Sequence, residues 1–370
     1  MILGVLKDDD DRVALTPDVV QKLADQHQIW VEAGAGASAF YSDELYTEAG
    51  ASVTSAQEVI GKANVLVRIK PPSEAVLQQL AANSVVISSF QPFNHPEVVE
   101  ALSQYPLTVF SMDMLPRTTL AQDKDVLSSM ASIAGYRAVL EAATHLPRYF
   151  PMLTTAAGSI PPAKVLVLGV GVAGLQAIAT AKRLGSVIEA FDTRAAVKEE
   201  VQSLGAKFVE VEGARDEKSA GGYAVEQTEE YKRRQQELIA EKSAKADVII
   251  STALLRGKRA PILITKETVE AMKPGSVIVD LAASGGGNCE LTQNNQTVQH
   301  QGVTIIGDSS LEAKMPMHAS QLYAKNIFNF LKILVKEKEG ELSLDFENPL
   351  VKGSCLVHDG QPYYQVSQQT

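Results

Sequence analysis

The sequence predicts an α/β protein that contains two doubly wound parallel sheets joined by two long helices. Short apolar segments alternate with amphipathic ones in two separate stretches of the chain, which is the pattern of parallel strands connected by helices. A long helix-like segment that starts at Asp125 separates the two stretches, and a second one covers residues 319–336. The 370 residues are enough for two domains with cores of their own.

In the first stretch, the predicted strands are MILGVL, QIWVEAG, VLVRIKPP, SVVISSFQP and LTVFSMD. The segment TPDVVQKLAD predicts a helix, because Thr16 is a typical N-cap residue and Pro17 is favoured in the first helical turn. The amphipathic segments SEAVLQQLAA and HPEVVEALSQ supply further helices between strands.

The second stretch follows the Ala- and Ser-rich helix DVLSSMASIAGYRAVLEAATHL. Its predicted strands are KVLVLG, VIEAFD, KFVEV, DVIIST, SVIVDLA and VTIIG. We therefore expect one domain from residues 1–125 and 319–370, completed by the returning C-terminus. The second domain is expected to be residues 126–318, including the linker helix.

Composition and charge exclude several classes of protein. The net charge of −10, without a basic patch, argues against nucleic-acid binding. Cys289 and Cys355 are far apart and lack metal-type spacing, so no metal site is expected, and a reduced cytosolic setting fits best. The uncharged segment VLVLGVGVAGLQAIATA has 17 residues, fewer than the ~20 of a membrane helix. The start of the chain does not read as a signal peptide.

A glycine motif lies between a predicted strand and a predicted helix. Gly169 permits a tight turn, Gly171 lets a pyrophosphate approach the backbone, and Gly174 lets helix and strand pack closely. The next strand ends at Asp192, where an acid can meet the adenosine ribose hydroxyls. This context predicts a Rossmann-like nucleotide site rather than an ordinary glycine-rich turn. Asp192 favours NAD(H); Arg194 is expected to be solvated, with acceptance of a 2′-phosphate as the alternative.

Two later segments have open interpretations. Asp280 and the GGGN segment that contains Gly286 follow another predicted strand, so they either line the nicotinamide pocket or form a turn. Residues 212–231 are polar and long for a connection between strand and helix. We favour a lid, with Tyr223 covering the cofactor, over a disordered loop.

Several segments together resemble one known family. RVALTP, PPAKVLVLGVGVAGLQAIATAKRLG, AGGYA, MKPGSVIVDLA and GGNCE are similar to the alanine dehydrogenase and nicotinamide nucleotide transhydrogenase superfamily. The segment MLPRTTLAQDKDVLSS, followed by AGYRA, resembles the NAD(H)-binding component (domain I, alpha subunit) of proton-translocating transhydrogenases. The resemblance covers nearly the whole chain.

The resemblance implies that Arg117, Gln122 and Asp125 hold the nicotinamide end of the dinucleotide and act as the catalytic residues. The alternative is a surface loop in which Asp123 or Asp125 only caps the following helix, a role expected of Asp123. The predicted cofactor-binding residues are Ser128, Ser129, Gly169, Gly171, Val172, Ala173, Gly174, Asp192, Thr193, Arg194, Tyr223, Asp280 and Gly286.

Two departures distinguish the chain from alanine dehydrogenases. Lys70 and Arg12 match their substrate-binding residues, but Gln91 stands where they carry a catalytic histidine, and Ser284 where they carry an aspartate. Amine oxidation needs a titratable base, whereas hydride passage between two nicotinamide rings needs positioning. His95 is a conceivable substitute base, although a loop histidine is more often structural or solvated.

The resemblance implies an NAD(P) transhydrogenase (proton-translocating, Re/Si-specific) that acts as part of a complex. NADH would bind to this chain and NADP(H) to a partner's domain, while membrane-spanning subunits couple the transfer to proton translocation. A homodimer on the cytoplasmic face of the inner membrane is expected. The alternatives are a free-standing alanine dehydrogenase-like enzyme and a non-enzymatic NAD(H)-responsive binding module.

Overall fold

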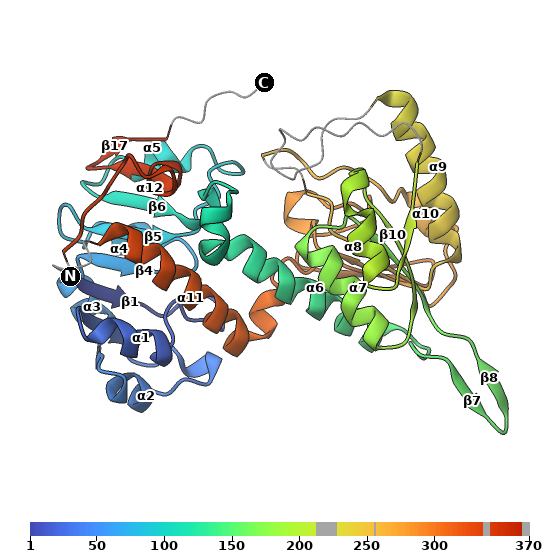
Figure 1. Ribbon diagram of the computed structural model, residues 1–370, viewed down its shortest axis with the longest axis horizontal. Coiled ribbons are helices and arrows are strands. Elements are labelled where there is room, and N and C mark those ends of the chain that lie inside the picture. The colour runs from blue at the N-terminus through green and yellow to red at the C-terminus, as the bar shows by residue number, and fades with distance from the viewer. Residues whose placement is uncertain (212–227, 255–256, 336–340, 365–370) are drawn as a thin grey trace. The chain divides into compact units, whose positions relative to one another are not determined.

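The computed structural model describes residues 1–211, 228–254, 257–335 and 341–364. The chain divides into two compact units, shown in Figure 1. The first unit contains Met1–Met130 and Ala313–Thr370, and the second contains Ala131–Glu312. Each unit is built around its own sheet.

The sheet of the first unit has the order β17-β16-β6-β5-β4-β1-β2-β3. Its strands are β1 (Ile2–Val5), β2 (Gln28–Glu32), β3 (Ser52–Thr54), β4 (Val65–Val67), β5 (Val85–Ser88), β6 (Thr108–Ser111), β16 (Cys355–His358) and β17 (Gln361–Pro362). The first six strands are parallel, and β16 joins β6 in the antiparallel direction. The chain therefore adds its C-terminal segment to the sheet with which it begins.

Helices cover both faces of this sheet. They are α1 (Pro17–Ala24), α2 (Asp43–Glu48), α3 (Ala56–Lys62), α4 (Glu74–Leu77), α5 (Val98–Leu102), α11 (Pro316–Leu334) and α12 (Pro349–Ser354). Pro17 opens α1 after Thr16, as predicted, although the Thr16 hydroxyl accepts no hydrogen bond from a helix amide and instead donates to Asp18 Oδ1 (2.6 Å). The long helix α11 packs on the sheet through contacts such as Phe330 against Phe110, whose rings are 5.6 Å apart.

The sheet of the second unit has the order β11-β10-β9-β12-β13-β15-β14. Its strands are β9 (Lys164–Leu168), β10 (Val187–Phe191), β11 (Lys207–Val209), β12 (Val248–Ser251), β13 (Val277–Asp280), β14 (Thr297–His300) and β15 (Val303–Ile306), with only β14 antiparallel to its neighbour. Its helices include α7 (Val172–Arg183), α8 (Lys198–Ser203), α9 (Glu229–Lys245) and α10 (Lys266–Glu270). This order is that of a Rossmann sheet, with its topological switch between β9 and β12.

A two-stranded hairpin was not predicted. Strands β7 (Leu153–Thr155) and β8 (Gly158–Ile160) pair only with each other among the described strands, and Figure 1 shows them extending away from the large sheet of their unit. Met152, just before β7, is 63% exposed.

The two units are connected by helix α6 (Val126–His145), which contains the boundary between Met130 and Ala131. The chain returns through the short 3₁₀ turn η7 (Leu311–Lys314) before α11 begins, so α11 lies within the first unit. The predicted fold class of two doubly wound parallel sheets is confirmed.

The predicted lid segment ends earlier than expected. Thr228 caps α9 by accepting a hydrogen bond from the Tyr231 amide (3.2 Å), so residues 229–231 belong to a helix. Tyr223 lies outside the described residues. Among the described helices, none is long and apolar enough to cross a membrane.

Candidate functional site

The glycine motif forms a narrow turn at the carboxyl end of β9, next to the switch point. Gly169 has φ +92°, and a Cβ there would lie 2.7 Å from Thr252 Oγ1. A Cβ on Gly174 would lie 2.0 Å from the Gly169 carbonyl oxygen. By contrast, a Cβ on Gly171 would meet no protein atom within 4 Å. Two glycines are thus required by the fold, and the third leaves open space in front of the turn.

Helix α7 begins directly after this open space. The Leu175 amide donates to the Gly171 carbonyl (2.9 Å) as the first bond of the helix. The amides of Val172, Ala173 and Gly174 therefore precede the helical hydrogen-bond ladder, and the N-terminus carries partial positive charge. An anion such as a pyrophosphate fits this arrangement, because the missing Cβ of Gly171 leaves room for it.

Helix α6 supports the same turn from behind. A Cβ on Gly135 would lie 2.1 Å from the Ala173 carbonyl oxygen, so the backbones of α6 and α7 touch directly. Gly135 was not predicted as a site residue. The segment ASIAGYRA gave no sign of which neighbour required a glycine.

Asp192 follows β10 and is held firmly in the second unit. Its Oδ2 accepts the Val170 amide (2.7 Å) and Arg194 Nη2 (2.8 Å), and its Oδ1 accepts the amide and Nε of Arg194 (both 2.9 Å). Arg194 also donates to the Val170 carbonyl (3.1 Å). The expectation of a solvated Arg194 was wrong, because the arginine folds back onto Asp192 across Thr193. A ribose hydroxyl would donate to the Asp192 carboxylate, either beside these donors or in place of one of them.

A buried tyrosine lies near Asp192 and was missed by the sequence interpretation. Tyr231, in the first turn of α9, is 3% exposed. Burial, reinforced by the charge of Asp192, raises the pKa of Tyr231 to about 12. The Tyr231 phenol therefore stays protonated at neutral pH and can donate a hydrogen bond.

Asp280 fastens the end of β13 to the loops around it. Its Oδ1 accepts Ser251 Oγ (3.0 Å) and the Ala282 amide (3.0 Å). Its Oδ2 accepts the amides of Asn288 (2.7 Å) and Cys289 (3.0 Å), together with Thr292 Oγ1 (2.7 Å). Because Asp280 is fully buried and five donors surround it, the turn-forming interpretation fits and direct contact with a ligand does not.

Gly286 belongs to the turn that Asp280 holds. It has φ +101°, and a Cβ there would lie 2.9 Å from Arg259 Nε. The neighbouring Ser284 is exposed on the short helix η6 (Ala283–Gly285). Its hydroxyl is not a titratable base near neutral pH.

The polar loop of residues 114–129 lies entirely in the first unit. It contains the 3₁₀ helix η3 (Thr119–Lys124) and leads into α6. Asp125 caps α6, because its Oδ1 accepts the Ser128 amide (2.9 Å) and its Oδ2 the Ser128 hydroxyl (2.6 Å). The expectation that Asp123 caps the helix was therefore wrong. Asp123 instead pairs with Lys124 Nζ at 2.6 Å.

Two asparagines of α11 hold this loop in place. The Nδ2 atoms of Asn326 and Asn329 donate to the Asp123 carbonyl at 2.9 and 3.1 Å, and Ser129 Oγ donates to Asn326 Oδ1 at 2.7 Å. The backbone that carries Gln122 is thus fixed, while Gln122 itself is exposed. Asn326 was missed because it is 204 residues along the chain from Gln122, with no motif around it.

Arg117 is exposed at the start of the same loop. The preceding Pro116 contacts α12 closely, since a Cβ on Gly353 would lie 2.5 Å from the proline Cγ. The loop is therefore supported at both ends, by α12 before Arg117 and by α11 at Asp123.

The residues that match alanine dehydrogenase substrate ligands are already paired. Arg12 Nη2 lies 2.6 Å from Asp10 Oδ2, and Lys70 Nζ lies 3.4 Å from the same oxygen. Gln91, in the position of the dehydrogenase histidine, has φ +52°. His95 is largely exposed and lies 3.5 Å from Glu97.

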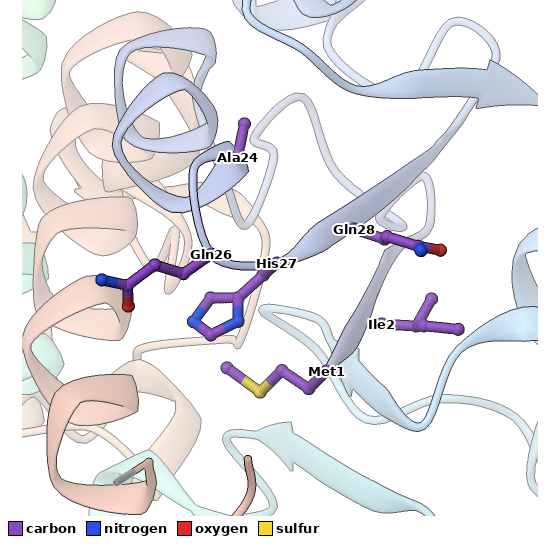
Figure 2. A pocket seen from close by; sticks show the side chains of 6 residues that line it. All are labelled: Met1, Ile2, Ala24, Gln26, His27 and Gln28. Atoms are coloured by element: carbon purple, nitrogen blue, oxygen red, sulfur yellow. The ribbon is translucent and has the colours of Figure 1, made fainter. Parts of the chain in front are cut away.

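A cavity of about 330 Å³ opens at the amino ends of β1 and β2, and Figure 2 shows the side chains around it. Its lining includes Met1, Ile2, His27 and Gln28. Ligands of doubly wound sheets bind at the carboxyl ends of the strands. This cavity is at the opposite end and does not belong to the candidate site.

The fold and the glycine turn together define a Rossmann-class protein whose helix α7 begins at a space suited to an anion. Residues 6–134 match the family described as "Alanine dehydrogenase/PNT, N-terminal domain", and residues 138–365 match "Alanine dehydrogenase/PNT, C-terminal domain". The chain belongs to this alanine dehydrogenase/PNT family, which confirms the resemblance predicted from the sequence.

Three similar proteins have names that include transhydrogenase. The "NAD(P) transhydrogenase subunit alpha" of Haemophilus influenzae is 43% identical over 98% of this chain and 71% of its own length. A Rhodospirillum rubrum protein, named as one portion of an NAD(P) transhydrogenase subunit alpha, is 44% identical over 95% of this chain and 94% of its own length. The solved structure of "transhydrogenase from Sinorhizobium meliloti" has a TM-score of 0.89 and 41% identity, covering 98% of this chain and all of that one.

Proposed function

We propose that this chain is the NAD(H)-binding component of a proton-translocating NAD(P) transhydrogenase. Bound NADH supplies the hydride, and NADP⁺ on a partner subunit accepts it. Membrane-spanning partner subunits couple this transfer to proton translocation. The observation that carries the proposal is a rigidly supported, exposed Gln122 in a chain more than 40% identical to transhydrogenase alpha subunits.

The residue types at two positions of the chain support hydride transfer without acid–base catalysis. Gln91 and Ser284 occupy the positions where the alanine dehydrogenases carry a histidine and an aspartate. Neither side chain exchanges a proton near neutral pH. Hydride passage between two nicotinamide rings requires no proton at the reacting carbons, so positioning of the rings is sufficient.

Each region of the candidate site has a distinct role in this proposal. The first turn of α7 binds the pyrophosphate, and Asp192 binds the adenosine ribose. Gln122 hydrogen-bonds the carboxamide or ribose of the nicotinamide half. Arg117 and Asp125 organise the loop, and the observed cap on α6 fits that role for Asp125.

The proposed assembly contains further copies and partners. We propose a homodimer, peripherally associated with the cytoplasmic face of the inner membrane. The hairpin β7–β8 supports self-association, because Ile160 at its end is 39% exposed and Met152, just before β7, is 63% exposed. Leu120, which is 70% exposed beside Gln122, supports docking of the NADP(H)-binding partner at this loop.

The test is the substitution Gln122→Asn, with Gln104→Asn as the matched control. Both glutamines are exposed in the first unit, and only Gln122 is in the loop. Hydride transfer from NADH to NADP⁺ is measured with a purified NADP(H)-binding partner domain. NADH affinity is measured separately by fluorescence titration.

Gln122→Asn is expected to lower turnover by about tenfold or more while NADH affinity stays within about threefold, because the shortened amide no longer orients the ring. Gln104→Asn is expected to match the unchanged chain. Large loss of NADH binding with normal turnover of bound cofactor would contradict the role of Gln122. Robust NAD⁺ reduction with alanine, in the absence of any partner, would instead identify an amino-acid dehydrogenase.

A further inference from the structure

The loop that carries Gln122 contains a buried lysine. Lys124 is only 8% exposed, whereas Gln122 and Asp123 before it are exposed. All three belong to the 3₁₀ helix η3, in which residues three apart share one face. Ala121 and Lys124 therefore form the buried face of η3, where an apolar residue would be expected. An ammonium group in such a place lowers stability unless it is paired.

The Lys124 ammonium group is paired within its own loop. Its Nζ donates to the Leu120 carbonyl at 3.2 Å and to Asp123 Oδ1 at 2.6 Å. Both hydrogen bonds are charge-assisted, and such bonds are stronger than those between neutral groups. The two acceptors lie on either side of Gln122 along the chain. Lys124 thus holds the backbone before and after Gln122 at once.

Contacts with α11 fix the same segment from another side. The Asp123 carbonyl accepts hydrogen bonds from Asn326 Nδ2 (2.9 Å) and Asn329 Nδ2 (3.1 Å). Asp123 is therefore held through its carboxylate by Lys124 and through its carbonyl by the helix. Gln122 directly precedes this doubly held residue, and its exposed side chain starts from a backbone that has little freedom to move.

We propose that Lys124 is a positioning residue for Gln122. The inference rests on the proposed function, in which the Gln122 amide orients the nicotinamide half. Lys124 keeps the loop in one conformation, so that this amide meets the ring without a preceding rearrangement. Reactions that depend on positioning are steep in distance, and a misplacement of about 1 Å can lower the rate about 100-fold.

The proposed division of the site separates the effect on turnover from the effect on affinity. The first turn of α7 and Asp192, which the proposed function assigns to the pyrophosphate and the adenosine ribose, lie in the second unit. These contacts do not involve Lys124, which lies in the first unit. Loss of the lysine should therefore lower the rate of hydride transfer and leave NADH affinity nearly unchanged.

The variant Lys124→Met removes the ammonium group and keeps an unbranched side chain, and Lys22→Met is the matched control. Lys22 is on α1 of the same unit with its side chain 53% exposed, so its loss changes the net charge equally. Turnover is measured at saturating NADH with a purified NADP(H)-binding partner domain, and NADH affinity by fluorescence titration. Gln122→Asn and the double variant K124M/Q122N complete a double-mutant cycle.

Lys124→Met is expected to lower turnover about fivefold or more, with NADH affinity within about threefold of the unchanged chain. Turnover of K124M/Q122N is expected to stay within about threefold of that of Q122N, because Lys124 acts through Gln122. Lys22→Met is expected to match the unchanged chain. Normal turnover of Lys124→Met would overturn the proposal. A loss in the double variant equal to the product of the two single losses would also overturn it.

Hydrogen exchange supplies a readout that does not depend on the reaction. Amide exchange in residues 119–124 is followed by mass spectrometry for each full-length protein without cofactor. Lys124→Met is expected to exchange about tenfold faster there than the unchanged chain or Lys22→Met. Equal exchange would show that Lys124 does not hold the loop. An unchanged chain that transfers no hydride would refute the proposed function, and the exchange rates would then decide the role of Lys124.

The variant Asp123→Ala covers the case in which Lys124→Met does not fold. The Asp123 side chain is 57% exposed, and its removal takes away one of the two acceptors of Lys124 Nζ. Exchange in residues 119–124 is expected to rise about threefold, and turnover to fall while NADH affinity is retained. Exchange and turnover equal to those of the unchanged chain would refute a positioning role for this pair.

Discussion

The two glycines Gly171 and Gly174 allow a direct test of the proposed pyrophosphate site at the first turn of α7. An added methyl group meets different surroundings at each of them. At Gly171, φ −84° and ψ −164° are open to any residue, and a Cβ would meet no protein atom within 4 Å. Gly171→Ala is therefore expected to change the free energy of unfolding by less than about 1 kcal/mol.

The same methyl group occupies the space in front of the first turn of α7. A pyrophosphate would have to move away from the amides of Val172 and Ala173 to avoid it. Loss of one good anion contact is worth at least about 1.4 kcal/mol, so the Kd for NADH is expected to rise tenfold or more.

Gly174→Ala is expected to act first on the stability of the fold and only through it on NADH affinity. Its Cβ would lie 2.0 Å from the Gly169 carbonyl oxygen, so helix α7 has to shift by more than about 1 Å. Overpacking of this kind costs about 1–3 kcal/mol, which lowers the Tm by about 2–12 °C for a domain of this size. NADH affinity falls as a consequence of the displaced helix.

The assay combines thermal unfolding, without cofactor, with fluorescence titration of NADH. Gly61→Ala is the control, because a Cβ on Gly61 also meets nothing within 4 Å and Gly61 lies on α3 in the other unit. A Gly171→Ala protein that binds NADH as tightly as the Gly61→Ala control would refute the proposal that a pyrophosphate occupies the space in front of α7. A Gly174→Ala protein with unchanged Tm would refute the packing argument.

Three further predictions concern buried groups. Asp280→Asn is expected to lower the free energy of unfolding by about 2–4 kcal/mol in urea titrations, because an amide group would face the Ala282 amide donor; an unchanged midpoint would contradict the five-donor arrangement. Burial raises the pKa of the Cys289 thiol to about 11 and that of Cys355 to about 12, so neither should react with a thiol reagent at about pH 8 until the chain unfolds. Burial and the charge of the N-terminal amine lower the pKa of His27 below 6.5, so the unfolded chain takes up its proton first and stability falls as the pH drops below 6.5. His27→Gln should lose this component of the pH dependence. The difference in urea midpoint between His27→Gln and the unchanged chain is measured at about pH 7.5 and at about pH 5.5, and the same difference at both would show the assignment to be wrong.

Much of the fold follows from periodicity in the sequence. The segments KVLVLG and SVIVDLA predicted buried parallel strands, and both are central in the sheet of the second unit. Strand β14 and the hairpin β7–β8 were missed, because their exposed polar and glycine residues carry no apolar pattern. Their pairing depends on turns and on neighbouring strands, which periodicity does not report.

The candidate site was predictable to a lesser degree. The turn at Gly169 could be located, because a strand, three glycines and a helix follow one another directly in the chain. The partners of Asp192 and Asp280 could not, since a carboxylate next to a strand end can face either a ligand or the protein. Only the folded backbone shows that Arg194 and the amides of residues 288 and 289 surround them. The anchoring of Gln122 through Asn326 depends on segments far apart in sequence, and spacing carries no information about such contacts.

The buried carboxylates Asp8, Asp192 and Asp280 have a common consequence for recognition. Each fastens a strand end to the loop or strand beside it. The carboxyl edges of both sheets are therefore ordered by the fold itself, and little conformational entropy remains to be lost there on association with a ligand. Calorimetric signatures of cofactor binding should accordingly resemble those of a rigid receptor, with the heat-capacity change set by the surface that the nucleotide covers.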